Sequence, residues 1–220
     1  MVKRLFDIIF SFLGIVVLSP LILFLIVIVS CTSRGGPFFF GPRVGKNGKI
    51  FKIIKFRSMK ANSEGQGAWN ISAKDPRVTK VGLFLRKTKL DEIPQLFNVL
   101  CGQMSFVGPR PELQYYVNMY TEEEKAILDN KPGMTDWASI VNASQIVVFT
   151  KEKDADEAYL RYIRPLKLKL QLHYRYHNNL SIDLKCLLWT FWKLVSRTKK
   201  NPKEIIDIVE NYQKEMGMNA

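Results

Sequence analysis

The sequence predicts an α+β fold, rich in helices, in which a small cytosolic domain follows a kinked, re-entrant N-terminal membrane helix. Three observations lead to this class: residues 8–33 carry no charge, two apolar runs flank a turn signal at Asn47-Gly48, and helical periodicity dominates the remainder. A length of 220 residues, with 47% hydrophobic and 24% charged residues, excludes a disordered chain and a protein of many membrane spans.

The N-terminal segment has the length and polarity of a membrane element. As a helix, residues 8–33 would measure about 39 Å, more than the roughly 30 Å of a bilayer core. Ser19 and Pro20 lie in its middle; because proline lacks a backbone donor, we expect a kink there, with the serine hydroxyl serving a freed carbonyl. Both flanks are basic, and positive charge favours the cytoplasmic side, so a helix that enters and leaves through one face satisfies both.

Two other interpretations of this segment stay open. A spanning helix with a cytoplasmic C-terminal domain satisfies only the richer C-terminal flank. Residues 28–31, Ile-Val-Ser-Cys, loosely resemble the cleavage box of an exported lipoprotein, although the apolar stretch is long and proline interrupts it. The three cysteines are far apart and form no CxxC pair, which argues against a disulfide framework or a zinc site.

The rest of the chain divides into strands, loops and helices. Strands are predicted at 40–44 and 50–56 around the Asn47-Gly48 turn, with a polar loop at 60–76 and a further strand within 141–150. Helices are predicted at 81–87, 91–100, 113–130, 154–177 and 182–195. We therefore expect a membrane helix at 1–33, a domain at 34–200 and a polar, weakly amphipathic C-terminal tail at 201–220.

The side chains of two later helices suggest where these helices lie. Residues 182–195 combine leucines, tryptophans and lysines, which is typical of an interfacial helix lying on the bilayer, and an ordinary core helix explains them nearly as well. His173 and His177 are spaced i, i+4; with no third ligand in view, a helix face at the lipid interface is favoured over a metal site.

The charge balance indicates an anionic partner. Lys+Arg number 33 against 20 Asp+Glu, for a formal net charge of +13. Nucleic acid, acidic lipid head groups and a phosphorylated substrate are the three partner classes that such an excess suits.

The densest chemical signal is the carboxylate pair Asp91-Glu92, preceded by Arg86, Lys87 and Lys89. A helix start at Asp91 would offer free amides to an anion. One ionised carboxylate can attack phosphorus without a base, while the other can hold Mg²⁺ against phosphate oxygens. The plainer interpretation is that Asp91 caps the helix and Glu92 complements its dipole.

Further cations accompany this pair. Lys55 and Arg57 are two residues apart and would lie on one side of a strand. Pro109 and Pro111 enclose Arg110, which gives the arginine a stiff mount for a phosphate or nucleobase contact, or simply makes a rigid surface turn.

These pieces, taken in order, resemble the bacterial sugar transferase family, the monotopic polyprenyl-phosphate phosphoglycosyl transferases, in their minimal form. The likeness runs from the N-terminal segment to about residue 198 and rests on residues 55–59, 75–82, 86–100, 104–112 and 132–135. It implies transfer of sugar-1-phosphate from a UDP-sugar to undecaprenyl phosphate, with release of UMP, by a ping-pong route through a phosphosugar-aspartate intermediate.

The resemblance also implies roles for single residues. Asp91 would be the nucleophile and Glu92 the Mg²⁺ ligand. Arg86 and Arg110 would hold phosphate or nucleotide, with Lys55 and Arg57 as supporting cations. The break in the membrane helix falls at Ser19-Pro20, as in the family's re-entrant helix, and Pro109 and Pro111 would stiffen the Arg110 turn.

The chain departs from the family pattern in two places. Asp136 stands where the family commonly has glycine, and Ala143 follows Asn142 where Val-Asn-Gly is common. Both positions fall near expected sugar or nucleotide contacts, so the sequence leaves the sugar unnamed.

The resemblance further implies a bacterial inner-membrane enzyme with its catalytic domain facing the cytoplasm, at the first membrane step of a capsule, lipopolysaccharide or exopolysaccharide. Inner-membrane lipids are expected partners and nucleic acid is not; the sequence leaves a homo-oligomer open. The competing hypothesis is a non-catalytic, membrane-anchored basic module that binds acidic lipid or nucleic acid through the net charge of +13.

Overall fold

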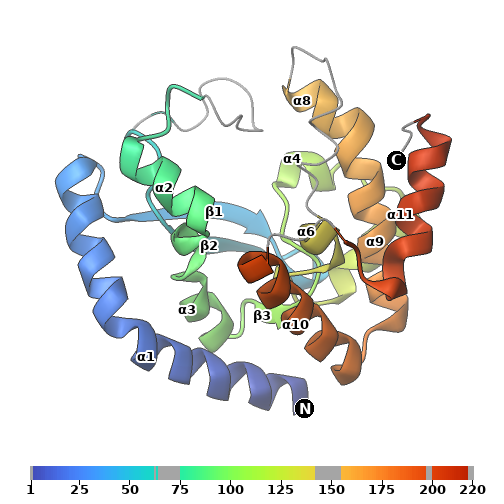
Figure 1. Cartoon of the computed structure of the whole chain (residues 1–220), viewed down its shortest axis with the longest axis horizontal. Helices are drawn as coiled ribbons and strands as arrows, with labels where there is room; N and C mark the ends of the chain where they lie inside the picture. The colour runs from blue at the N-terminus through green and yellow to red at the C-terminus, as the bar shows by residue number, and fades with distance from the viewer. Residues whose placement is uncertain (1, 62, 64–74, 142–154, 197–199, 218–220) are drawn as a thin grey trace. The chain divides into compact units, whose positions relative to one another are not determined.

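Figure 1 shows a computed structural model of the chain, which describes residues 2–61, 63, 75–141, 155–196 and 200–217. Helices dominate, and the described strands form two small sheets, β1–β2 and β3–β4. The helix-rich α+β class is therefore confirmed. Two compact units, Met1–Ser105 and Phe106–Ala220, are described separately below. The functional boundaries expected at residues 33 and 200 stay a prediction.

Helix α1 (Val2–Thr32) is the apolar N-terminal segment, with Pro20 inside it. Pro20 cannot donate to the carbonyl of Val16, four residues earlier, and the Ser19 hydroxyl donates to that oxygen instead, at 2.7 Å. The ribbon of α1 changes direction along its length (Figure 1). Among the described residues, α1 is the one helix long and apolar enough to cross a membrane. The re-entrant and the spanning topology both remain predictions.

The two ends of α1 are attached to unit 1 by different contacts. Near the N-terminus, the Arg4 guanidinium donates to the carbonyls of Val99 and Leu100, at 2.6 and 2.8 Å. Further along, Ile22, Leu25 and Val29 pack in an apolar cluster with buried side chains of the hairpin and α2. Many remaining apolar side chains of α1 are exposed, Val17 by 73%. This apolar surface is what a helix in contact with lipid requires.

A hairpin follows, formed by β1 (Phe38–Val44) and β2 (Ile50–Phe56), in antiparallel register with Val44 opposite Ile50. Asn47 and Gly48 adopt φ of 56° and 75° in the connecting turn, Lys46–Gly48. The predicted strands and turn are confirmed. Most of the predicted polar loop at 60–76 lies outside the described residues.

Helix α2 (Lys80–Thr88) is confirmed, with Thr79 capping its first turn through the amide of Gly82. Lys89, at φ 60°, ends it; the chain then forms a 3-10 turn, Leu90–Glu92, followed by α3 (Gln95–Leu100). The prediction of one helix at 91–100 with Asp91 as its cap is therefore wrong. Because the left-handed Lys89 leads directly into the 3-10 turn, Asp91 has helical rather than extended backbone geometry.

In unit 2, short helices replace the single one predicted at 113–130: α4 (Gln114–Val117), α5 (Glu122–Lys125) and a 3-10 turn at Ala126–Asp129. Thr121 and Glu124 form a capping box, which starts a new helix and so divides the segment. Strands β3 (Ser105–Val107) and β4 (Gly133–Thr135) pair, and α6 (Trp137–Val141) follows. The strand predicted within 141–150 falls outside the described residues, except Val141, which ends α6.

Three long helical segments complete unit 2. The first, close to the predicted 154–177, comprises α8 (Ala155–Ala158), a π-helical turn at Tyr159–Ile163 and α9 (Arg164–His177). Helix α10 (Leu180–Ser196) confirms the next prediction. The segment predicted to be a tail contains α11 (Lys203–Glu215). Three of its side chains are buried in the core of unit 2: Ile205, Val209 and Tyr212.

Helix α10 has two apolar sides. Cys186 is fully buried in the unit 2 core, whereas Leu188, Phe191 and Trp192 are exposed by 56–67%. A helix buried on all sides is thus excluded, and the exposed side suits an interfacial position. On α9, the rings of His173 and His177 stack at 4.4 Å, and the described residues contain no group of three or more metal-ligating side chains.

Candidate active site

Asp91 is the central residue of the unit 1 site. It lies in the 3-10 turn between α2 and α3, is only 6% exposed, and its Oδ1 has no hydrogen-bond partner. Burial raises the pKa of its carboxyl, against the attraction of Lys55 and, more weakly, Lys89 and Arg86. A buried carboxylate that keeps one oxygen free amid three cations suits nucleophilic attack on an anionic substrate.

Glu92 lies beside Asp91 and faces β2. Its Oε1 accepts from the ammonium of Lys55 at 2.9 Å, and both side chains are largely shielded from solvent. The structure therefore brings together three of the predicted site residues: Asp91, Glu92 and Lys55.

Arg86 and Arg57 were both predicted as substrate cations, and their surroundings differ. The Arg86 Nε donates to the hydroxyl of buried Ser58 at 2.8 Å. Burial lowers the pKa of Arg86, and the Asp91 carboxylate opposes that shift. Arg57 instead donates to the carbonyls of Gly36 and Phe38, at 3.1 and 2.9 Å, and so ties down the segment that leaves α1. Its substrate role stays a prediction.

Close packing of the α2 backbone at Gly82 against the backbone of Ser58 places Arg86 next to the Ser58 hydroxyl. A Cβ at Gly82 would lie 1.9 Å from the Ser58 carbonyl oxygen, so only glycine allows α2 to pack there. The amide of Thr79 donates to the same carbonyl at 3.0 Å. Ser58 is thus held in place and accepts the hydrogen bond that orients Arg86. The sequence did not indicate this role, because a serine after a strand carries no distinctive signal.

A second contact joins the segment that follows the Asp91-Glu92 pair to the hairpin. Asn98 of α3 accepts from the Ile54 amide and donates to the Lys52 carbonyl, at 2.9 and 2.8 Å. Both backbone groups flank Ile53 on β2, two residues from Lys55. This contact fixes α3 against the strand that presents Lys55 to Glu92.

Gln95, at the start of α3, is fully buried, and neither its amide nitrogen nor its oxygen has a hydrogen-bond partner. Residues 90–100 follow a nearly continuous right-handed helical path. Gln95 follows Asp91 by four residues and begins α3. An unsatisfied buried amide this close in sequence to the candidate nucleophile is a costly feature of the kind found at functional sites.

This reading of Gln95 predicts a gain in stability on substitution. Gln95→Met keeps the volume and removes the unpaired amide, so the free energy of unfolding should rise by about 1–3 kcal/mol. The matched control is Asn98→Leu, which deletes an amide that is fully bonded and should destabilise the protein. Denaturant unfolding measures both, and a loss of stability in Gln95→Met would contradict the assignment.

The donor set fits the Mg²⁺ that was expected. Mg²⁺ takes oxygen ligands and is commonly held by one or two carboxylates, with waters and substrate phosphates completing the shell. Glu92 offers a carboxylate, and the adjacent Asp91 has a buried Oδ1 without a hydrogen-bond partner. Waters and substrate phosphates would then complete the shell around the carboxylate of Glu92.

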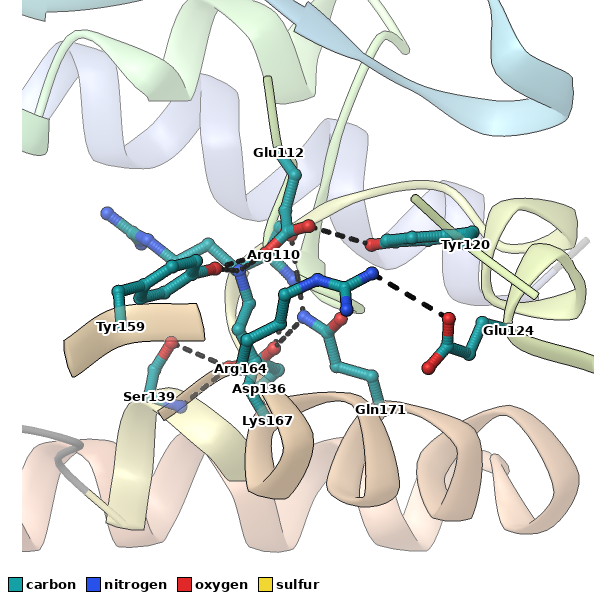
Figure 2. A network of polar contacts seen from close by, with 10 residues as sticks. All are labelled: Arg110, Glu112, Tyr120, Glu124, Asp136, Ser139, Tyr159, Arg164, Lys167 and Gln171. Carbon is teal, nitrogen blue, oxygen red and sulfur yellow. Dashed lines mark hydrogen bonds and ion pairs between the residues drawn. The ribbon is translucent and has the colours of Figure 1, made fainter. Parts of the chain in front are cut away.

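Arg110 belongs to unit 2. Its Nη1 donates to the Met134 carbonyl at 3.1 Å. The substrate role of Arg110 and the stiffening role of Pro109 and Pro111 stay predictions. Two residues on, Glu112 is 5% exposed and is surrounded by donors: Lys167, Tyr159 and Tyr120 (Figure 2). The sequence reasoning missed Glu112, because its partners come from distant helices.

The electrostatics of Glu112 are those of a satisfied buried anion. Burial raises the pKa of this carboxyl, but the Lys167 ammonium and the hydrogen bonds from Lys167, Tyr159 and Tyr120 outweigh burial, and the pKa is lowered. Burial and the Glu112 charge raise the pKa of both tyrosines, which therefore remain protonated donors.

Comparison with known proteins shows independently which family the chain resembles. The sequence model for the family described as bacterial sugar transferase matches residues 1–197. A UDP-N-acetylgalactosamine-undecaprenyl-phosphate N-acetylgalactosaminephosphotransferase of Aeromonas hydrophila is 36% identical over 190 residues, covering 85% of this chain and 41% of that protein.

Two further relatives are also named as undecaprenyl-phosphate transferases. A putative undecaprenyl-phosphate N-acetylgalactosaminyl 1-phosphate transferase of Bacillus subtilis is 43% identical, over 56% of this chain and 68% of the relative. An undecaprenyl-phosphate galactose phosphotransferase of Salmonella typhimurium is 44% identical, over 60% of this chain and 31% of the relative. The chain thus spans less than half the length of the Aeromonas and Salmonella proteins.

Proposed function

The chain belongs to the bacterial sugar transferase family, and on that premise we propose that it transfers sugar-1-phosphate from a UDP-sugar to undecaprenyl phosphate. The names of relatives from three bacteria give undecaprenyl phosphate as the acceptor. The observation that carries the proposal is the buried Asp91 carboxylate, with one unpaired oxygen in the field of Lys55, Lys89 and Arg86.

The proposed reaction has two displacements at one phosphorus. In the first, an oxygen of ionised Asp91 attacks the phosphorus that bears the sugar, and the bond to the bridging oxygen breaks. UMP leaves with that oxygen and its electron pair, and an acyl phosphate forms on Asp91. In the second, a phosphate oxygen of undecaprenyl phosphate attacks the same phosphorus. The Asp91 carboxylate is released and a polyprenyl diphosphate sugar results.

The neighbouring side chains would serve the charge of this reaction. Arg86, held on Ser58, offers a fixed cation for a phosphate oxygen, and Lys55 neutralises Glu92 until the substrate arrives. Glu92 would hold Mg²⁺, which when bound offsets the repulsion between the carboxylates and the diphosphate. Arg110 would contact the nucleotide, where a planar guanidinium suits phosphate or base.

The membrane part of the proposal follows from the acceptor. A lipid-bound phosphate lies at the head-group plane, and the exposed apolar side chains of α1 suit a helix at that depth. We propose that the protein lies in the bacterial inner membrane, with α1 re-entrant at Pro20 and the Asp91-Glu92 pair on the cytoplasmic side. The product would enter surface glycan assembly.

The re-entrant topology predicts one-sided labelling. In a chain with Cys31 and Cys101 replaced by serine, Val2→Cys and Lys46→Cys should both react with an impermeant maleimide from the cytoplasmic side only. Inverted and right-side-out vesicles provide the two exposures. Reaction of the cysteine at position 2 from the periplasmic side would show a spanning helix instead.

The function is tested by incubating the purified chain with Mg²⁺, undecaprenyl phosphate and each member of a panel of UDP-sugars. UMP release with formation of a lipid diphosphate sugar is the expected result, and the productive donor names the sugar. If no UDP-sugar yielded UMP, the transferase proposal would be wrong. The alternative of a non-catalytic basic module has no support among the relatives, which are named as transferases.

A further inference from the structure

Both backbone polar groups of Arg110 are held by side chains from elsewhere in unit 2. The Arg110 amide donates to Asp136 Oδ2 at 2.9 Å, and the Gln171 Nε2 donates to the Arg110 carbonyl at 3.4 Å. The same Nε2 also donates to Asp136 Oδ2, at 2.8 Å (Figure 2). Asp136 and Gln171 therefore form a single bracket around one residue.

The Asp136 carboxylate is fully committed to the protein. Asp136 is completely buried, and its Oδ1 accepts from both the amide and the hydroxyl of Ser139, at 2.7 and 2.6 Å. A substrate cannot reach it, although its sequence position suggested a place among sugar or nucleotide contacts. Any effect of Asp136 on the substrate must pass through the groups that it holds.

The segment on either side of Arg110 is equally constrained. Pro109 and Pro111 fix their own φ angles and restrict the residue before each. Beyond them, Glu112 is fastened by Lys167 of α9, with Tyr159 and Tyr120 at 2.5 and 3.1 Å. Two buried carboxylates thus fix a four-residue segment whose one long cationic side chain is Arg110.

We propose that Asp136 and Gln171 are positioning residues, which hold the backbone of Arg110 so that its guanidinium meets the nucleotide of the donor in a fixed place. This inference rests on the proposed function, which gives Arg110 a nucleotide contact. A side chain whose backbone is already ordered loses less conformational entropy on binding, and the gain appears as affinity.

The test is a double-mutant cycle between Gln171 and Arg110, read as the dissociation constant of UMP for the full chain in detergent. Gln171→Met keeps the volume and removes both donations. We expect both Gln171→Met and Arg110→Ala to weaken UMP binding about tenfold, and the double variant to bind no worse than Arg110→Ala alone. In turnover, Gln171→Met should raise the KM for the UDP-sugar and leave kcat within about twofold.

Two controls separate positioning from general damage. Ser139→Ala removes a bond to the other oxygen of the same carboxylate and should leave UMP affinity unchanged. Asp136→Asn keeps the side-chain shape but replaces one accepting oxygen by an NH2 group, which cannot accept a hydrogen bond. It should weaken UMP binding, provided that circular dichroism shows the variant to be folded. Should Asp136→Asn not fold, the Gln171 cycle decides alone.

The outcomes distinguish the inference from the function beneath it. If Arg110→Ala leaves UMP affinity unchanged, the nucleotide role of Arg110 is wrong, while UMP release by the wild type still tests the transferase. If Arg110→Ala weakens binding but Gln171→Met does not, or if the two effects simply add, the bracket does not position Arg110 and the inference is overturned.

Discussion

Asp91→Asn should lower the rate of UMP release by a factor on the order of 10³ or more, with every UDP-sugar that the wild type uses. The amide of asparagine is a far weaker nucleophile than a carboxylate and cannot form a stable acyl phosphate. Side-chain volume and the backbone of the 3-10 turn are unchanged. The loss should therefore appear in the first displacement, measured as UMP released in a single turnover without acceptor.

The same substitution should leave the fold intact or strengthen it. Burial disfavours the charged form of Asp91, as its raised pKa indicates, and a neutral amide removes that penalty. We therefore expect the free energy of unfolding of Asp91→Asn to equal or exceed that of the wild type. Inactivity without destabilisation identifies a group that the protein keeps for chemistry rather than for packing.

Glu92→Gln is the matched control for the neighbouring carboxylate. It removes the charge that pairs with Lys55 and the expected Mg²⁺ ligand, but leaves the nucleophile in place. Activity should fall less than in Asp91→Asn and should recover partly at high Mg²⁺. Normal turnover by Asp91→Asn, or a trapped sugar-phosphate adduct on another side chain, would refute the assignment of the nucleophile.

Local signals in the sequence predicted the elements that depend on neighbours in the chain. Asn47-Gly48 specifies its turn because both residues accept positive φ, and the strands on either side follow from their apolar runs. Ser19 was expected to serve a carbonyl freed by Pro20, and it bonds that of Val16. Asp91 and Glu92 were identified as a pair, and Lys55 does lie against the second of them.

What could not be predicted depends on partners far away in sequence. Nothing local to Arg57 indicates that the carbonyls of Gly36 and Phe38 occupy it. Ile205, Val209 and Tyr212 are spaced i, i+4 and i+7, which favours an amphipathic helix, but only the finished core shows what buries that face. Asp91 was mistaken for a helix cap because residue preferences cannot show that Lys89 adopts a left-handed conformation.

The Glu112–Lys167 pair has the largest expected effect on stability. Lys167→Met removes the ammonium and leaves Glu112 buried with only the tyrosine hydroxyls to donate. Breaking one side of a buried ion pair costs roughly 3–5 kcal/mol, because the remaining charge is desolvated without compensation. Urea unfolding should show this loss at pH 7. The double variant Glu112→Gln, Lys167→Met should recover most of it, since no charge then remains.

The pH dependence separates this electrostatic account from a loss of packing. In the wild type the pKa of Glu112 is lowered, so its contribution to stability is complete above the ordinary carboxyl pKa of about 4.3 and is lost as pH falls through the folded value. In Lys167→Met, only the hydrogen bonds from Tyr159 and Tyr120 oppose the effect of burial, so we expect the pKa of Glu112 to rise, and stability to increase towards acid as protonation removes the buried charge. The difference in unfolding free energy between the two proteins should therefore be smaller at pH 4 than at pH 7. An equal difference at both values would mean that Lys167 contributes through its aliphatic contacts alone.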